Sequence, residues 1–377
     1  MPQYFNRPPR IQPELPSGEF DIPNPPSTSA QTGRLGLLTM AIPLIMIVSY
    51  AFVASQGGNF MMLLPLALTG TVSAAVGYLT WRRNQQNDEN RQNHYELMLS
   101  DLEGQLQEIE TKQKNFYNHN FPATEVVLNF PKQPNPRLWE RRTHDRDFGA
   151  VRMGVGRIRS SLSLRPPTQQ NFDSPHMLRA RRIKEQYESV QDVPVALALR
   201  NIHAVGICGQ KYERTSCFTR SCLVGLTALH TPGDLRLFIV GAPDAISQWS
   251  WAESLPHCRR GRQEQEVNAG EQLCFDLRTM QTFWNSIQTE LERRQKQLEI
   301  DDKADVSLPL LVVIIDLSTP QTSALREKII AETAVSMLLN MGTKLGAAVV
   351  FLLPNVESIP SECLAVIKVD EDTQNPV

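Results

Sequence analysis

The sequence predicts a membrane-anchored α/β protein, made of a two-helix transmembrane hairpin, a helical stalk, a small β-rich region and a parallel α/β domain. Two apolar runs near the N-terminus, a polar helical pattern after them and alternating strand-like and helical segments in the C-terminal half predict this architecture. The 377 residues are 41% hydrophobic and 21% charged, which excludes a wholly disordered chain and a transporter with many spans. The net charge of -2 excludes a global cationic field that would recruit nucleic acid.

The two apolar runs predict a transmembrane hairpin over residues 35–81. Leu35–Ala54 and Phe60–Trp81 contain no charged residue, and each is long enough to cross a hydrocarbon core of roughly 30 Å. The turn between them is short and uncharged, whereas arginines flank the hairpin on its outer sides. By the positive-inside rule, we expect a two-span protein of the inner or plasma membrane with both termini in the cytoplasm.

The segments beside the hairpin differ in pattern. Residues 1–34 are rich in Pro, Ser and Thr, so we expect a disordered cytoplasmic tail, and residues 371–377 are expected to form an acidic tail. Residues 82–120 predict a helical stalk, because apolar residues recur at three- and four-residue steps from Tyr95 to Ile109. This narrow stripe suits pairing with another helix, including one from a second copy, and suits equally a helix that lies on its own domain.

Residues 121–192 are predicted to form a small β-rich, basic region. Between Arg137 and Lys184 there are 12 Arg or Lys residues against four Asp or Glu, a local net charge of +8. Such a cluster suits an acidic partner or phospholipid head groups, and the alternative is a solvated, salt-bridged surface. The aromatic interleaving typical of single-strand nucleic-acid binding is missing. We assign partner contacts to six residues here and further along the chain: Arg137, Trp139, Arg141, Arg142, Trp249 and Trp251. For the two last tryptophans, core packing is the alternative.

Residues 193–370 predict a mostly parallel sheet covered on both faces. Strand-like runs lie at 195–200, 204–209, 235–241, 308–317 and 347–353, and helical segments lie at 213–230, 279–298 and 324–339. The segment 204–211 stands where a phosphate-binding loop would follow a strand. The sequence therefore predicts a P-loop-NTPase-like domain.

The motifs of this domain are degenerate. Gly206 and Gly209 are too closely spaced for a P-loop, Lys211 is followed by Tyr212 instead of Ser or Thr, and no GK[ST] occurs in the chain. Asp316 ends an apolar strand, where a carboxylate that organises Mg²⁺ would stand, but no second acid follows it. We expect no catalytic residue, no metal site, no bound cofactor and no hydrolysis by this segment.

Several stretches together resemble the N-terminal part of a known family. They are Arg7-Pro-Pro-Arg10, Arg137-Leu-Trp-Glu-Arg-Arg142 with Asp145, Asp147-Phe148 and Val151-Arg152-Met-Gly154, then Val193-Pro194, Ala228 to Arg236, and Trp249 with Leu255-Pro-His257. The chain is similar in these to EccC/EssC-type proteins, the FtsK/SpoIIIE-like ATPases of type VII secretion systems. In that family the region looks like the anchor, stalk and noncatalytic ATPase-like domain that precede tandem ATPase domains with intact motifs.

The resemblance implies a component that anchors and assembles a type VII-like secretion machine and couples its pore to cytosolic ATPase domains. The expected partners are other membrane subunits of the complex, the lipid bilayer and further copies of the chain, and ATP with Mg²⁺ is expected only in the full-length family. The chain is shorter than the family, so it is either a split component or a fragment. The alternatives are a fragment of an FtsK-like DNA translocase and a membrane-tethered scaffold unrelated to secretion.

Overall fold

The computed structural model describes residues 8–26, 63–132, 135–168, 175–259, 272–300, 308–319 and 323–369, with isolated positions between 45 and 55. The chain folds into two compact units. The α/β unit comprises Met1–Glu14, Asn115–Arg157 and Gln191–Val377, and the helical unit comprises Leu15–Lys114 and Ile158–Val190.

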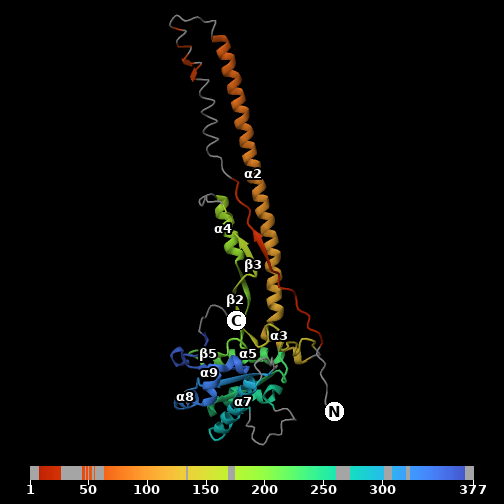
Figure 1. Cartoon of the computed structure of the whole chain (residues 1–377), viewed down its shortest axis with the longest axis vertical. Helices are drawn as coiled ribbons and strands as arrows, with labels where there is room; N and C mark the ends of the chain where they lie inside the picture. The colour runs from red at the N-terminus through yellow and green to blue at the C-terminus, as the bar shows by residue number, and fades with distance from the viewer. Residues whose placement is uncertain are drawn as a thin grey trace. The chain divides into compact units, whose positions relative to one another are not determined.

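Six strands form the central sheet of the α/β unit, in the order β10-β5-β9-β8-β6-β7. This part of the chain is coloured from green to blue in Figure 1. Every neighbouring pair is parallel, as the sequence predicts. Because parallel strands bring their carboxyl ends to one edge, the residues that follow β5, β6 and β8 meet there. The strands are β5 (Ala204–Cys208), β6 (Leu235–Gly241), β7 (Leu273–Cys274), β8 (Leu310–Asp316), β9 (Ala347–Leu353) and β10 (Ala365–Lys368).

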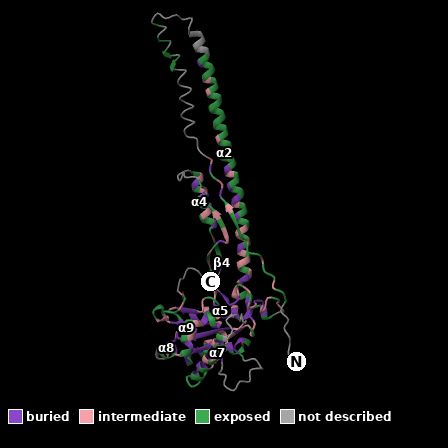
Figure 2. Cartoon of the chain, viewed as in Figure 1, coloured by how far each residue is buried: buried purple, intermediate pink, exposed green. Residues whose placement is uncertain are grey.

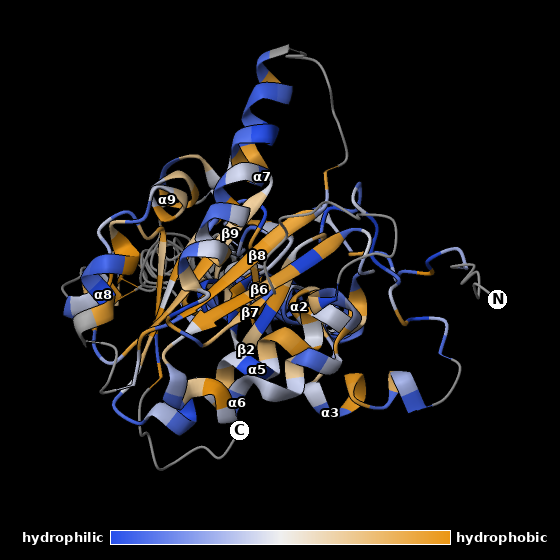
Figure 3. Cartoon of the chain, turned by 90° about the horizontal axis from the view of Figure 1, so that it is seen from below, coloured by the Kyte–Doolittle hydropathy of each residue, from blue (hydrophilic) through white to orange (hydrophobic). Residues whose placement is uncertain are grey.

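Helices cover both faces of this sheet. Helix α5 (Tyr212–Leu229) packs on one face, and α7 (Met280–Ile300), α8 (Ser323–Ile330) and α9 (Thr333–Leu345) pack on the other. Strands β8 and β9 are buried at every position, and their side chains alternate between the two cores. Figure 3 shows the apolar strands of this sheet in orange. Continuous apolar runs therefore mark the centre of a sheet that is covered twice.

The remaining elements of the α/β unit are two strands outside the central sheet and several short helices. Strands β2 (Ala150–Arg159) and β4 (Ser189–Ala198) form a separate two-stranded sheet. The predicted strand 195–200 therefore belongs to β4 and not to the central sheet. The short helices are α3 (Thr124–Val127), η2 (Phe130–Lys132), η3 (Pro243–Ala245), α6 (Ile246–Trp249), η4 (Ser250–Ser254), η5 (Pro256–Cys258) and η7 (Val356–Ser358).

The helical unit is built on α2 (Leu63–Asn120), whose last residues belong to the α/β unit. The predicted apolar stripe of α2, from Tyr95 to Leu106, is buried against α4 (Pro175–Tyr187) and against Phe20, Leu162 and Leu164. Figure 2 shows the change from exposed to buried residues along α2. The described stripe thus packs within its own chain, against one helix and two strands of the helical unit.

Part of the predicted N-terminal tail is ordered. Strand β1 (Gly18–Asp21) pairs in parallel with β3 (Leu162–Arg165), and Ile22 beside it is 3% exposed. The prediction of a disordered tail over residues 1–34 is therefore wrong for this strand. Its partner lies more than 140 residues away, so composition alone did not reveal the pairing.

The predicted transmembrane hairpin is contradicted. Among the helices that the structure describes, none combines the length and the apolar character needed to cross a membrane. Most of the first run, Leu35–Ala54, lies outside the described residues. The described part of the second run begins α2, which continues as one helix into polar sequence. The membrane-anchored fold class and the two-span localisation with cytoplasmic termini are corrected on this finding.

Candidate functional site

The carboxyl edge of the central sheet brings together the loop after β5 and the end of β8. Gly209 and Lys211 follow β5, and Asp316 is the last residue of β8. Strand β9 lies between β5 and β8, and Gly206 and Asp316 pair with its residues Phe351 and Leu352. The degenerate positions that the sequence singled out therefore lie on one edge of one sheet, the edge where ligands bind in open parallel folds.

Asp316 is fully buried, and its carboxyl group accepts four hydrogen bonds. The Tyr212 hydroxyl and the Trp249 indole Nε1 donate to Oδ2, at 3.1 and 2.8 Å. The Ser318 backbone N and hydroxyl donate to Oδ1, at 3.2 and 2.6 Å. A carboxylate offers about four lone-pair sites, and these four donors use that capacity.

Tyr212 begins α5 directly after Lys211, at the position where a P-loop has its Ser or Thr. Burial and the neighbouring Asp316 raise the pKa of its phenol above the ordinary value. The phenol therefore stays protonated, and its hydroxyl donates a hydrogen bond to Asp316. In a working P-loop NTPase, the Ser or Thr and the strand-end Asp both ligate Mg²⁺. Here a direct hydrogen bond joins the two positions.

The loop after β5 is packed against the chain itself. A Cβ on Gly209 would lie 2.6 Å from Thr215 Oγ1 and 2.8 Å from the Val369 carbonyl oxygen. The Val369 backbone N also donates to the Cys208 carbonyl at 2.8 Å. Gly206 is covered by Ile359, which a Cβ there would meet at 2.7 Å. Protein atoms thus lie against both glycines.

Lys211 occupies the N-terminal cap of α5 with an extended backbone, and its side chain is exposed. Its carbonyl oxygen accepts from the backbone N of Arg214 and of Thr215. Across the described residues, no group of three or more His, Cys, Asp or Glu side chains is arranged to hold a metal ion. The arrangement at this edge is one of side chains that bind one another.

The residues predicted to bind a partner lie in different environments. Trp249 is fully buried and binds Asp316, whereas Trp251 is half-buried and donates to the Gln248 carbonyl at 2.9 Å. Trp139 is half-buried, with a left-handed backbone (φ 59°), and its ring forms a T-shaped pair with His257. For Trp249, core packing accounts for the position.

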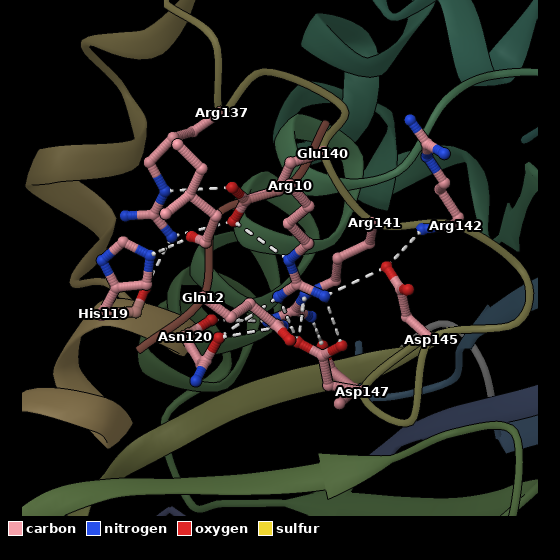
Figure 4. Close-up of polar contacts among 12 residues, drawn as sticks. Arg10, Gln12, His119, Asn120, Arg137, Glu140, Arg141, Arg142, Asp145 and Asp147 are labelled. Carbon is pink, nitrogen blue, oxygen red and sulfur yellow. Dashed lines mark hydrogen bonds and ion pairs between the residues drawn. The ribbon is translucent and has the colours of Figure 1, made fainter. Parts of the chain in front are cut away.

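A second polar cluster joins the predicted arginines to the N-terminal segment (Figure 4). Arg141 is fully buried: its Nε lies 3.1 Å from Asp147 Oδ2, and its Nη atoms donate to the carbonyls of Ala150 and Asn120. Burial lowers the pKa of Arg141 to about 10. Arg137 pairs with Glu140 at 2.8 Å. Arg142 is half-buried, and its backbone N donates to Asp145 at 2.9 Å.

Two residues of these clusters were not among the site residues assigned from the sequence, although Arg10 lies in the Arg7-Pro-Pro-Arg10 stretch of the family resemblance. Arg10 binds Asp147 through both Nη atoms, at 2.7 and 2.6 Å, and its side chain is 8% exposed. Tyr212 was noted only as the residue that stands where a P-loop has its Ser or Thr. Its position directly after Lys211 was the available signal, because a large hydroxyl-bearing side chain there reaches the strand-end carboxylate.

The parallel sheet with a degenerate loop after β5 and a carboxylate at the end of β8 defines an α/β protein whose fold is consistent with a P-loop-like domain. Comparison with known proteins adds a family resemblance, although no family model matches the chain. Over 259 residues it is 26% identical to the ESX secretion system protein EccC of Thermomonospora curvata, covering 66% of this chain and 19% of that protein. Over 380 residues it is 21% identical to the type VII secretion system protein EssC of Staphylococcus aureus, covering 98% of this chain and 25% of that protein.

These relatives confirm the resemblance to EccC/EssC-type secretion proteins. The chain spans only 19% and 25% of the length of the two relatives. The solved ATPases 2 and 3 of EssC from Geobacillus thermodenitrificans overlap 64% of this chain and 41% of their own, with 15% identity. The TM-score of 0.39 is too low to carry an argument.

Proposed function

We propose that this chain is an assembly component of a type VII-like protein secretion machine, and that its α/β unit couples other subunits without hydrolysing ATP. The similarity to EccC and EssC supports the secretion assignment. The partners we propose are other subunits of the secretion complex, including further copies of this chain.

The hydrogen bonding of Asp316 is the main support for our proposal that this chain does not hydrolyse ATP. A hydrolytic site needs this carboxylate to organise Mg²⁺ beside the hydroxyl that follows the P-loop lysine. In this chain Tyr212 takes the hydroxyl position and binds Asp316 directly, while Trp249 and Ser318 use the remaining acceptor sites. A metal ion would have to displace buried hydrogen bonds to reach the same oxygens.

A domain that does not depend on nucleotide suits a constant mechanical role. The Tyr212–Asp316 bond joins the start of α5 to the end of β8, and the Trp249–Asp316 bond joins α6 to the same residue. These contacts need no ligand to form. We infer that the unit keeps one conformation during transport and passes force or position between its neighbours.

The test separates assembly from hydrolysis by replacing Lys211, which is exposed. In the organism that carries the gene, deletion should abolish export of the system's substrate, and a Lys211→Ala copy should restore export to the wild-type level. The purified chain should show no Mg²⁺-dependent ATP turnover. The proposal would be contradicted if the wild-type chain hydrolysed ATP and Lys211→Ala lost both this activity and export.

The partner contact predicted for Arg141 and Arg142 needs a test that leaves the fold intact. A double change of Arg141 and Arg142 to Glu would place an acid at a fully buried site beside Asp147, so it would disturb the fold. Arg142→Glu alone changes a half-buried side chain. If this arginine contacts a subunit, the single variant should keep its melting temperature and lose co-purification with the complex.

A further inference from the structure

The N-terminal segment Pro8–Gln12 is attached to the α/β unit by the Arg10 side chain and by single hydrogen bonds at Pro8, Ile11 and Gln12. Arg10 is nearly buried, with 8% of its side chain exposed. Its neighbours Pro8, Pro9 and Gln12 are exposed, and Ile11 is 84% exposed. A segment that buries one guanidinium and no large apolar side chain is held as a peptide ligand is held, by an anchor residue.

The anchor enters an acidic cradle, formed by Glu140, Asp145 and Asp147. The Arg10 Nη atoms bind both oxygens of Asp147, at 2.7 and 2.6 Å, and Nη1 also reaches Asp145 at 3.1 Å. Its Nε lies 4.0 Å from Glu140. Figure 4 shows the guanidinium directed into this group. A bidentate geometry of this kind selects a planar guanidinium over the point charge of a lysine.

The cradle has supports that do not involve Arg10. Asp147 is also bound by Arg141 at 3.1 Å, and Glu140 is bound by Arg137 at 2.8 Å. Asp145 accepts from the backbone N of Arg142 at 2.9 Å. Each carboxylate is therefore oriented by another group of the same unit. The cradle is pre-organised to receive an arginine, which lowers the cost of binding one.

We propose that this acidic cradle is a docking site for an extended arginine peptide, and that a second copy of this chain supplies the peptide through its own Pro8–Gln12 segment. The copy's segment is identical, so it offers the same guanidinium with the same flanking residues. Exchange of an identical element between copies keeps every native contact and is a low-cost route to association. Pro8, Pro9 and Pro13 keep the segment extended, so little freedom is lost when it docks. This inference stands without the secretion assignment.

The experiment mixes two full-length variants with different affinity tags. The Arg10→Ala copy keeps its cradle but has no anchor. The Asp147→Asn copy keeps its anchor but has a disabled cradle. Neither variant should associate with itself through this site, whereas the mixture should form a complex with one copy of each. We expect recovery of the second tag at least about 10-fold above either variant alone.

A matched control changes only the shape of the anchoring cation. Adding Arg10→Lys to the Asp147→Asn copy should reduce recovery from the mixture by about 10-fold, because lysine lacks the bidentate fork. Circular dichroism must show that each copy is folded. If Asp147→Asn unfolds because Arg141 loses its partner, Asp145→Asn replaces it as the weakened cradle. A mixture of folded copies that remains uncomplexed, or a complex that tolerates lysine fully, would overturn the proposal.

Discussion

At the residue scale, Asp316 and Tyr212 show how a phosphate-binding position becomes a structural one. The phenol follows Lys211 and reaches the strand-end carboxyl group, which is fully buried. Since burial and the neighbouring Asp316 raise the Tyr212 pKa, the phenol is protonated at neutral pH and acts as a hydrogen-bond donor. The pair therefore contributes to stability at a place where a hydrolytic enzyme would hold a metal ion.

A double-mutant cycle measures this contribution. Tyr212→Phe and Asp316→Asn should each lower the free energy of unfolding, and the double variant should lose less than the sum, with a coupling energy of about 1 kcal/mol or more. Urea denaturation supplies the four values. The control pair is Trp251→Phe with Asp316→Asn: the Trp251 indole donates to Gln248 instead, so coupling should be near zero. A Tyr212–Asp316 coupling no larger than this control would argue against the bond.

His230 makes stability depend on pH. Its Nδ1 donates to the Leu226 carbonyl at 2.7 Å, and its Nε2 accepts from the Gly149 backbone N at 2.9 Å. This arrangement is neutral, and burial, with Arg141 nearby, lowers its pKa to about 3 from an ordinary 6.5. Between these values the unfolded chain binds a proton that the folded chain does not. Stability should therefore fall as pH decreases below about 6.5.

The expected slope from this one group is about 1.4 kcal/mol per pH unit, once the unfolded histidine is fully protonated. Urea denaturation between pH 4.5 and 7 measures it. His230→Gln should be less stable at neutral pH. The slope of its unfolding free energy against pH should be smaller, by the amount that corresponds to about one proton. His144→Gln is the control, because it removes a histidine whose side chain is 74% exposed. An unchanged slope in His230→Gln would contradict the assignment.

At the scale of elements, Arg294 of α7 ties two other elements together. Its Nη1 donates to the carbonyls of Leu345 and Gly346, at 2.9 and 3.1 Å, and its Nη2 donates to Pro309 at 2.9 Å. Its Nε binds Glu290 at 2.8 Å. The side chain is fully buried and donates to carbonyls at the end of α9 and before β8, of which the Gly346 carbonyl also accepts from the Leu311 backbone N at 3.0 Å.

Arg294→Lys should cost about 3 kcal/mol or more, because a lysine cannot reach three carbonyls and a carboxylate in this forked geometry. The matched control is Arg293→Lys on the same helix, which also pairs with Glu290 but is 56% exposed. That variant should lose less than about 1 kcal/mol. Chemical denaturation of both variants measures their free energies of unfolding. Equal losses of this free energy would show that the contacts of Arg294 with the carbonyls contribute little.

The elements predicted correctly from the sequence are those whose pattern is local. Strands β8 and β9 are continuous apolar runs, so both their presence and their central position follow from composition. Strand β10 was missed because it has four residues, and its Val366 is 51% exposed. Helix α4 was missed because its apolar residues cover only a narrow face of a basic segment. The predicted helix 324–339 is divided into α8 and α9 at Ala331–Glu332.

The candidate site was predictable in part for the same reason. Parallel topology places the loop after β5 and the end of β8 on one edge, so Gly206 to Lys211 and Asp316 could be grouped from the sequence. The donors to Asp316 depend on contacts across the fold, which the sequence does not show. Likewise, Arg141 and Arg142 are adjacent in the chain, yet one is fully buried and the other is half-buried. Their different roles follow only from tertiary structure.

At the scale of the whole molecule, each unit is assembled from separated stretches of the chain. The α/β unit contains the first 14 residues as well as the last 187, and the helical unit contains Ile158–Val190 besides Leu15–Lys114. Within the α/β unit, Arg10 fastens the first of these stretches to residues more than 130 positions away. Changes near the N-terminus should therefore affect the stability of the sheet-containing unit.

The response of the whole chain to nucleotide provides the last prediction. A ligand that binds only the folded state at 100 times its Kd adds about 2.7 kcal/mol of stability, which raises the melting temperature of a domain this size by several degrees. Because the acceptor sites of Asp316 are used by Tyr212, Trp249 and Ser318, millimolar Mg²⁺-ATP should shift the melting temperature by less than about 1 °C. Mg²⁺ alone is the control for ionic effects. A shift of several degrees that disappears in Lys211→Ala would show that the loop binds nucleotide despite its hydrogen bonds.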